Sequence, residues 1–450
     1  MENFVTSEAK EVFSIFKRIK NRDFKGNSGA AIKNSVYQVA GTFVSKIGSL
    51  LFTIILARIL MPELFGLYIL ALSTIVIFSF FTDLGTGQTL VRFLSKNISQ
   101  NKLSKSKINT IYLFNIKFLI TWGIFTLFLI LAKPLSIYYQ KPIFLILLSG
   151  SLYLFSISLS NFFRSFFESL NDFKTPFIRE TFFQILRLIL IPLLVIYLLY
   201  QSISGENILI IVFVSLGIIW AIMVLFLFFV AKKTPVFLAK KSKLSLKEKK
   251  EVNFFFISLI AFSVFSIIFS YSDIFILGGF VSSEYIGYYQ AAMGLIGSLS
   301  TLVLFSGSLF PIFSRLKGKA LELGFKKTLR ITFLISFTLF LISLLFSNVI
   351  ITTLYGKEYL QAIPFFRGLC FLLILWPFVA LYNGYFMAKG KPEVIKNLLI
   401  FISLFNLGLN FLLVYFLSQS SSYLAVLGLI GGTVFSNLLY LIGCVWKKRS

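Results

Sequence analysis

Charged side chains inside apolar stretches have the clearest potential for chemistry in this sequence. Lys46, Lys117 and Arg187 each lie well inside a run of apolar residues. An ionisable group in the hydrocarbon core of a membrane is costly and is a candidate functional group by default. Few acidic residues lie inside the same runs to neutralise these cations. We therefore predict that all three face a hydrated, positive cavity and bind an anionic substrate.

Polar residues at helical spacing accompany these cations, which favours a polar helix face around each. Ser49 follows Lys46 by three positions, and Glu180 and Gln184 precede Arg187 on one face. A structural interpretation stays open beside the functional one. A buried Lys or Arg can pair with a carboxylate and stabilise packing, and Asp83 and Asp273 are available for such pairing.

Four further charged residues are predicted to serve transport in other ways. Asp273 lies inside an apolar run and is the candidate for binding a coupling ion. Asp83 and Arg92 lie near the predicted inner end of the second run, where a gating or structural role is expected. Arg367 lies close to the predicted outer end of the tenth run, which suits a gate or an interfacial anchor.

Several classes of enzyme are excluded by what the sequence lacks. It contains no histidine, and its two cysteines stand apart in apolar runs, so neither a His-ligated metal nor a Cys-rich metal site is expected. It contains no Walker A loop, no Gly-rich dinucleotide turn and no Asp-x-Asp pair. We therefore predict neither a cofactor nor a metal, no catalytic residues, and no ATP hydrolysis by this chain.

The composition indicates the elements that must position these side chains. Hydrophobic residues make up 57% of the 450 and charged residues 13%, which is typical of an integral membrane protein. Twelve apolar runs are long enough to span a bilayer as helices. They cover 34–57, 65–91, 108–132, 142–163, 180–200, 207–231, 252–280, 286–311, 331–352, 363–388, 397–417 and 422–446. The predicted fold class is thus an all-α membrane protein with twelve transmembrane helices.

The distribution of basic residues predicts the orientation of these helices. Of the 43 Lys and Arg residues, 35 fall on one side of the predicted membrane, four on the other and four inside spans. Cytoplasmic loops are selectively basic, so both termini are predicted to be cytoplasmic. The formal net charge of +26 is explained by this topology, and nucleic acid is not an expected partner.

The predicted spans divide into two related halves. A basic amphipathic segment at 1–33 (alternatively a frayed tail) precedes six spans at 34–231, and a tail at 447–450 follows six spans at 252–446. The connection 232–251 carries eight lysines. The motif E-x-x-G-x-Y opens the second span at Glu63–Tyr68 and the eighth at Glu284–Tyr289. We therefore predict two six-helix bundles in parallel orientation around a central cavity.

The first two predicted spans resemble a known family. Residues 57–68 read A-R-x-L-x-P-x-x-F-G-x-Y, and Thr82-Asp83-Leu84-Gly85 and Arg92 follow. This pattern resembles the polysaccharide-transport family, the O-antigen-type flippases of the multidrug/oligosaccharidyl-lipid/polysaccharide exporter superfamily. The resemblance extends over about residues 30–446, although only the first two spans match closely.

The resemblance implies a fold and a function. It implies a V-shaped, alternately opening cavity between two bundles in the bacterial cytoplasmic (inner) membrane. Its substrate would be an undecaprenyl-pyrophosphate-linked oligosaccharide, such as an O-antigen unit of lipopolysaccharide, moved from the inner to the outer leaflet. Expected partners are this lipid-linked oligosaccharide, membrane lipids and other polysaccharide-assembly proteins.

Other functions stay open at this point. The nearest is a flippase for the lipid-linked peptidoglycan precursor, and the next is a drug/cation antiporter of the same superfamily, which would favour acidic rather than basic cavity residues. A membrane glycosyltransferase or polymerase would be expected to show a large outer loop or an acidic metal-binding cluster, and a scaffold would need no cations in mid-membrane. The sequence shows neither the loop nor the cluster.

Overall fold

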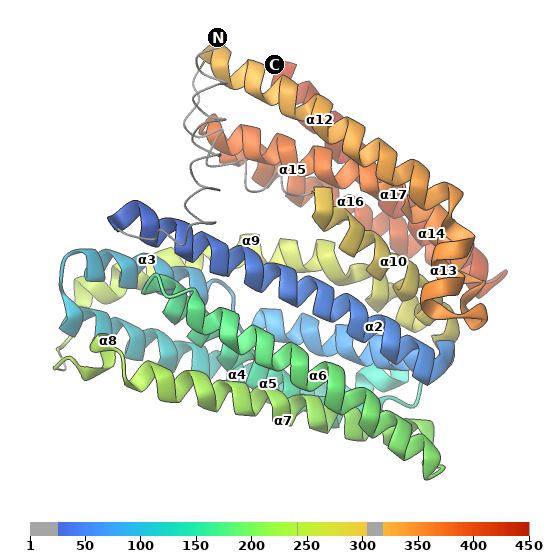
Figure 1. The fold of residues 1–450 in the computed structure, drawn as a ribbon, viewed down its shortest axis with the longest axis horizontal. Helices are drawn as coiled ribbons and strands as arrows, with labels where there is room; N and C mark the ends of the chain where they lie inside the picture. Colours follow the sequence, from blue (N-terminus) through green and yellow to red (C-terminus); the bar gives the residue numbers. More distant parts are fainter. Residues whose placement is uncertain (1–25, 241, 304–317, 450) are drawn as a thin grey trace.

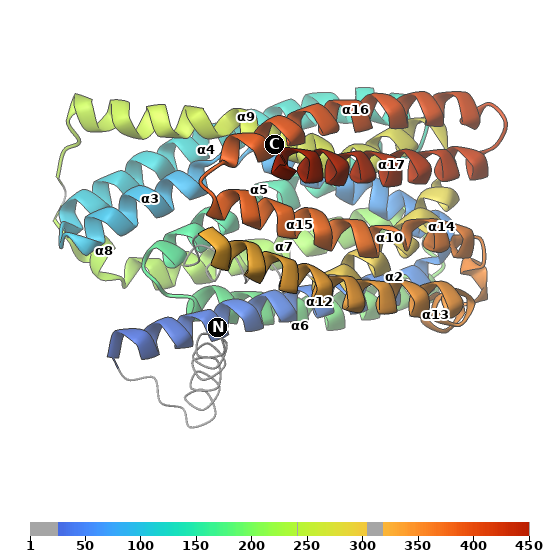
Figure 2. The same cartoon turned by 90° about the horizontal axis from the view of Figure 1, so that it is seen from above.

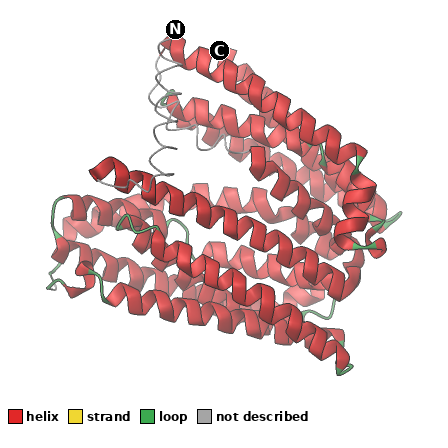
Figure 3. Ribbon diagram, viewed as in Figure 1, coloured by secondary structure: helices red, strands yellow, loops and turns green. Residues whose placement is uncertain are grey.

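The protein is described by a computed structural model that covers residues 26–240, 242–303 and 318–449. These residues fold into helices joined by short connections, and no strand occurs among them (Figure 3). An α-helix pairs its backbone N–H and C=O groups within one segment, as a chain in hydrocarbon requires. Most of the predicted N-terminal segment, residues 1–25, lies outside the described residues, and so does the end of the predicted span 286–311.

Helices α2 to α8 form the first half of the molecule (Figure 1). Their bounds are α2 Gly26–Phe81, α3 Thr86–Ser99, α4 Leu103–Tyr139, α5 Phe144–Ser169, α6 Lys174–Tyr200, α7 Gly205–Lys232 and α8 Pro235–Leu238. The second half begins at α9. Its elements are α9 Leu246–Phe280, α10 Ser283–Val303, α12 Gly318–Leu345, α13 Ser347–Tyr355, the 3-10 helix η2 Lys357–Tyr359, α14 Ala362–Leu369, α15 Leu372–Ala388, α16 Pro392–Ser418 and α17 Ser422–Arg449.

The first two predicted spans share the interrupted helix α2. Met61 has a φ of 62° and a ψ of 166°, which is not helical, and Pro62 follows it. Proline has no backbone N–H and clashes with the preceding turn, so the chain changes direction here. The predicted short loop at 58–64 is thus a kink between two helical segments.

The predicted continuous span 65–91 is wrong, because the chain leaves the helix after Phe81. Leu84 and Gly85 have φ values of 38° and 95°, and α3 begins at Thr86. Positive φ is easily adopted by glycine and rarely by other residues. Apolar residues continue on either side of this break, so the hydropathy of the sequence does not reveal it.

Nine helices among the described residues are long and apolar enough to cross a membrane, so twelve spans are not confirmed. The predicted span 34–57 and residues 65–81 of the next predicted span lie in one of the nine, Lys33–Phe81. This number rests on the described residues, which include only parts of the predicted spans 252–280 and 286–311. The protein is an all-α, multi-pass membrane protein.

The two halves converge at one end of the molecule and diverge at the other (Figure 1). Near the converging end, α2 and α10 approach through the two glycines of the repeated motif. A Cβ atom placed on Gly66 would lie 1.7 Å from the carbonyl oxygen of Ser283, and one on Gly287 would lie 2.3 Å from that of Pro62. Each glycine thus meets the carbonyl four positions before the other, so the contact is reciprocal.

Hydrogen bonds between the halves reinforce this contact. The Tyr359 hydroxyl donates to the carbonyl of Ala57 over 2.9 Å. Lys141, in the connection between α4 and α5, donates from Nζ to the carbonyl of Gly278 over 2.7 Å. Hydrogen bonds from η2 and from the connection between α4 and α5 therefore join the halves at the converging end.

Helix α9 contacts both halves along its length. Its first turn carries Glu248, whose Oε1 lies 2.6 Å from Nζ of Lys105 in α4. Hydrogen bonds from the Lys105 side chain and the Ser245 backbone lower the pKa of Glu248 to about 2. Farther along, α9 packs against α16, which lies with α17 on the side of the molecule opposite α12 (Figure 2).

Candidate functional site

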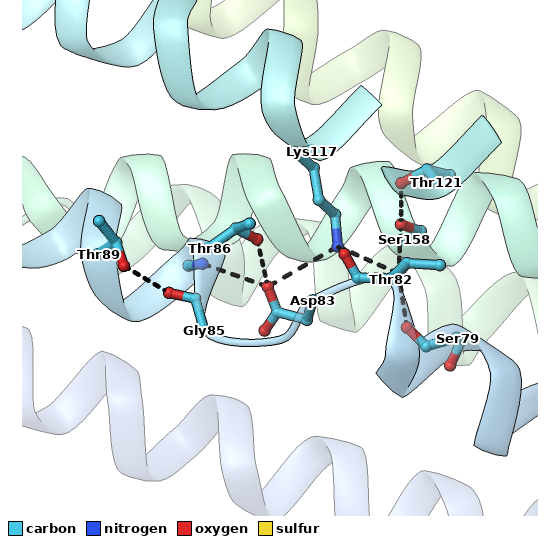
Figure 4. Close-up of polar contacts among 10 residues, drawn as sticks. Ser79, Thr82, Asp83, Gly85, Thr86, Thr89, Lys117, Thr121 and Ser158 are labelled. Atoms are coloured by element: carbon cyan, nitrogen blue, oxygen red, sulfur yellow. Dashed lines mark hydrogen bonds and ion pairs between the residues drawn. The ribbon is translucent and has the colours of Figure 1, made fainter. Parts of the chain in front are cut away.

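Lys117 of α4 binds the break between α2 and α3 (Figure 4). Its side chain is 0% exposed, and Nζ donates to the carbonyl oxygen of Thr82 over 2.9 Å and to its hydroxyl over 3.1 Å. The Nζ atom also lies 3.7 Å from Oδ1 of Asp83. Ser158 of α5 donates to the Thr82 hydroxyl and is itself hydrogen-bonded to Thr121. Two helices, α4 and α5, thus hold one interrupted segment.

Asp83 uses the same carboxylate oxygen to cap α3. Its Oδ1 accepts hydrogen bonds from the Thr86 hydroxyl over 2.7 Å and from the backbone N–H of Gly87 over 3.2 Å. A carboxylate satisfies the free N–H groups of a helix N-terminus and favours its dipole. The Asp83 side chain is 41% exposed, so it links the buried Lys117 to a solvent-accessible surface.

Lys117 therefore does not face water in this structure, which differs from its predicted position in a cavity. Thr121 lies one turn after Lys117 on the same helix face, but only tertiary packing brings α4 against residues 82–83. The pairing with Asp83 is the structural arrangement that the sequence analysis left open.

Replacing Lys117 by methionine is expected to lower the melting temperature of the purified protein. The substitution keeps the side-chain volume but leaves the buried Thr82 carbonyl without its donor, at a cost of about 1–3 kcal/mol. Lys133→Met, at an exposed position of the same helix, is the matched control. An unchanged melting temperature together with lost transport would contradict the structural role and support substrate contact.

Arg187 of α6 lies against α2 with no acidic partner in ion-pair contact among the described residues. Its Nη2 donates to Ser49 Oγ over 3.1 Å and to Gln184 Oε1 over 2.7 Å, and its Nε has no partner. The guanidinium also lies 4.3 Å from the centre of the Phe52 ring. A cation held by neutral groups retains most of its charge for an anionic ligand.

A ladder of polar contacts continues from Arg187 along α6. Gln184 donates from Nε2 to Glu180 Oε1 over 2.8 Å, and Glu180 Oε2 accepts from Arg179 Nη1 over 3.0 Å. Gly48 of α2 leaves room for this ladder, since a Cβ there would lie 2.7 Å from Gln184 Oε1. Sequence reasoning missed Arg179, because the predicted span began at 180 and placed it in a loop. Arg179 precedes Arg187 by eight residues, about two helical turns, and this spacing is the signal in the sequence that both could lie on one helix.

Lys46 is exposed on α2, the helix that also carries Ser49. It lines a cavity of about 210 Å³ with Arg179 and Glu180. No acidic side chain of the described residues forms an ion pair with it. The structure therefore brings Lys46 and the ladder of Arg187 together on the facing helices α2 and α6, and it places Lys117 elsewhere.

Asp273 lies in the second half, within a group of neutral hydrogen-bond donors. Its Oδ2 accepts from the Tyr289 hydroxyl over 2.8 Å, and its Oδ1 accepts from Asn410 Nδ2 over 3.1 Å. Thr433 approaches Oδ2 at 3.5 Å. The Oδ1 atom of Asn410 is buried and has no hydrogen-bond partner. The described residues contain no group of three or more His, Cys, Asp or Glu that could hold a metal.

The two remaining predicted residues lie on the surface at separate places. Arg92 of α3 stacks on the Phe255 ring of α9, with its guanidinium 4.1 Å from the ring centre. Arg367 of α14 is exposed and donates from Nε to Ser347 Oγ of α13 over 2.8 Å. Each joins neighbouring helices, and neither contacts the Arg187 ladder.

Comparison with known proteins gives a family and a fold. A model of the family described as "Polysaccharide biosynthesis protein" matches residues 31–317. No curated protein matches the chain. The lipid II flippase MurJ, in an inward closed conformation, aligns with a TM-score of 0.67 at 16% identity, over 92% of this chain and 87% of that protein.

Two MATE-family structures extend this likeness. An inward-facing conformation of a multidrug resistance MATE family transporter of the MOP superfamily aligns with a TM-score of 0.65 at 14% identity, over 92% of this chain and 97% of its own. An outward-facing conformation gives 0.52 at 16% identity, over 95% and 96%. The chain therefore shares the fold of these proteins.

Proposed function

The chain belongs to the polysaccharide biosynthesis protein family, and on that premise we propose that it moves a polyprenyl-pyrophosphate-linked oligosaccharide across a membrane. Family and fold together make it a multi-pass membrane transporter with a role in polysaccharide biosynthesis rather than an enzyme. The proposed substrate is the repeat unit of a surface polysaccharide such as an O-antigen.

The Arg187 environment is the observation that carries this proposal. A pyrophosphate headgroup cannot cross about 30 Å of hydrocarbon without groups that replace its water. Arg187 can form paired hydrogen bonds with phosphate oxygens, and Lys46 adds a second cation on the facing helix. Between the diverging halves, the headgroup would pass over these cations while the polyprenyl tail stays in lipid.

The orientation and the organisation into halves follow from the same proposal. We assign residues 34–231 and 252–446 to two bundles joined by the basic connection 232–251. The distribution of lysines and arginines supports a cytoplasmic position for the diverging end and for both termini. The described structure then corresponds to a state that receives substrate from the cytoplasmic leaflet of a bacterial inner membrane.

Asp273 is the proposed site for a coupling proton or cation. It lies sixteen positions before the tyrosine of the repeated motif in the second half, Tyr289. The corresponding position in the first half is Phe52, whose ring underlies Arg187. The first half thus offers a cation to an anionic headgroup, and the second offers a carboxylate to a positive ion.

The remaining charged residues are assigned to conformational roles. Lys117 and Asp83 hold the break between α2 and α3. Arg92 joins α3 to α9 toward the diverging end, and Arg367 joins α14 to α13 near the converging end. These contacts suit gates at the two ends of the passage better than direct binding of substrate.

Depletion of the protein in its native cell is expected to test the proposed function. Lipid-linked oligosaccharide should accumulate in the cytoplasmic leaflet, because its synthesis continues while its transfer stops. The measurement is the glycan composition of extracted lipids, together with lectin access in right-side-out and inverted membrane vesicles. Restoring the wild-type gene is the control.

The outcome also separates the rival functions. Accumulation of the peptidoglycan precursor instead would identify a flippase for that lipid, to whose solved example the fold is similar. Unchanged lipids with increased sensitivity to cationic drugs would identify a drug antiporter. Lipid-linked oligosaccharide already in the outer leaflet but not joined into polymer would identify a polymerase.

A further inference from the structure

A cavity of about 210 Å³ with a mixed polar and apolar wall opens in the first half, between α2 and the adjoining ends of α5 and α6. Two arginine–carboxylate pairs form part of its wall. Arg164 Nε lies 2.8 Å from Glu168 Oε1, and Arg179 Nη1 lies 3.0 Å from Glu180 Oε2. Lys46 on α2 adds an unpaired cation beside them.

One of these arginines is incompletely satisfied. The Arg179 side chain is only 3% exposed, yet its Nε has no hydrogen-bond partner among the described residues. A buried donor without a partner costs about 1–3 kcal/mol, so such groups are rare unless a ligand or water completes them. The Nε–H of Arg179 is therefore a donor that no group among the described residues uses.

The charges on the wall argue against a phosphate group inside this cavity. A phosphate needs donors alone, whereas Glu168 and Glu180 would repel it, and each neutralises its arginine. An arginine beside a carboxylate instead presents donors and acceptors next to each other. Neighbouring hydroxyl groups on a sugar ring, each both donor and acceptor, complement such a pair.

The size and the apolar part of the wall favour the same ligand. Tyr37 and Phe177 line the cavity, with ring centres 5.6 Å apart, and supply flat apolar surface for the C–H face of a sugar ring. The volume is below the range of about 300–1,000 Å³ usual for drug-sized ligands, so it suits one ring. We propose that this cavity binds one sugar residue of the lipid-linked oligosaccharide, beside the cations that receive its pyrophosphate.

This inference rests on the proposed function and adds a location for glycan recognition. In the proposed arrangement, Lys46 is shared between the two parts of the substrate, because it lines the cavity and lies one turn from Ser49, the partner of Arg187. The cavity then selects among glycans, whereas Arg187 responds to the pyrophosphate that all such substrates share.

Thermal stabilisation of the purified full-length protein by small probes tests the site. The probes are methyl glycosides of neutral hexoses, N-acetylhexosamines and uronic acids, and separately inorganic pyrophosphate. A ligand that binds only the folded state raises the melting temperature in a concentration-dependent manner. At least one glycoside should do so with wild-type protein, and Glu168→Gln should weaken its apparent affinity about ten-fold, as for a lost hydrogen bond to a charged group.

Two further variants complete the design. Arg164→Gln removes the other, half-exposed member of the pair and should weaken the same glycoside. Glu251→Gln, an exposed glutamate in α9, is the matched control and should change nothing. Stabilisation by pyrophosphate should persist in Glu168→Gln and be lost in Arg187→Ala.

Each outcome decides between the two proposals. No glycoside stabilisation, or one that survives both Glu168→Gln and Arg164→Gln, overturns the sugar site even if pyrophosphate still stabilises the protein. Stronger pyrophosphate binding by Glu168→Gln would overturn it as well, because the cavity would then be a phosphate site. If pyrophosphate does not stabilise the wild-type protein but a glycoside does, the result would count against the proposed function alone.

Discussion

Export of surface glycan is expected to fall about ten-fold or more when Arg187 is replaced by alanine. The guanidinium is held by Ser49, Gln184 and the Phe52 ring, none of which neutralises it. A hydrogen bond to a charged group contributes about 1.5–3 kcal/mol, and about 1.4 kcal/mol corresponds to a factor of ten. The measurement is surface glycan per cell at matched levels of transporter in the membrane.

Arg187→Lys separates charge from geometry. Lysine keeps the charge but lacks the planar pair of donors, so partial export is expected if charge suffices and none if paired contact with phosphate is required. Arg330→Ala, on an exposed position of α12, is the matched control and should export normally.

A structural role for Arg187 predicts a different result. The nearest carboxylate in its ladder is Glu180, which is bonded to Arg179 and Gln184 rather than to Arg187. If Arg187 serves only to balance this charge, the double variant Arg187→Ala with Glu180→Gln should regain export. Rescue of that kind, or full export by Arg187→Ala alone, would reject substrate contact.

The contrast between Lys117 and Arg187 shows what sequence alone can predict about such a site. Both were recognised as cations in apolar runs, and the helical faces around them were correct. Whether a cation finds a carboxylate depends on which helices touch. Lys117 meets Asp83 across α4 and the end of α2, whereas Arg187 meets a neutral serine of α2. The spacing of polar and apolar residues along one helix does not indicate which other helix it contacts.

Local backbone geometry limits the prediction in a second way. The sequence contains the turn-forming motif Thr82-Asp83-Leu84-Gly85, yet hydropathy predicts a continuous span because apolar residues continue on both sides. Two residues with positive φ interrupt the helix, and Asp83 restarts it as an N-terminal cap. An Asp followed two positions later by Gly is a turn signal that the hydropathy of the region conceals.

The repeated motif E-x-x-G-x-Y takes part in a contact that the sequence alone does not predict. Its two copies suggested related halves, and the structure brings their glycines into reciprocal contact. The sequence could not indicate that the motifs touch each other, since a repeat is equally compatible with distant copies. The contact explains in physical terms why each position holds glycine: the neighbouring backbone occupies the space of a side chain.

Replacing Gly66 by alanine is accordingly expected to abolish export and to lower the melting temperature. The new Cβ would lie 1.7 Å from the Ser283 carbonyl oxygen and 3.1 Å from the Gly287 nitrogen, so α2 and α10 must separate. Overpacking usually costs about 1–3 kcal/mol, and here the obstructing atoms are backbone that no rotamer change can move. Gly287→Ala should have the same effect through the carbonyl of Pro62, 2.3 Å from its Cβ.

Gly294→Ala provides the matched control on the same helix as Gly287, because among the described residues no atom beyond its chain neighbours and its own helix backbone lies within 4 Å of its Cβ position. It should keep both export and melting temperature, or gain slightly in stability from the higher helix propensity of alanine. Alternating access in which the halves pivot while this end stays closed requires close contact between α2 and α10. Export should then depend on glycine at positions 66 and 287, and alanine at position 294 should not change it. Normal export and stability of Gly66→Ala would show that α2 and α10 do not need to approach so closely. An equal loss of export and stability in Gly294→Ala would show that the effect is not specific to the contact between the halves.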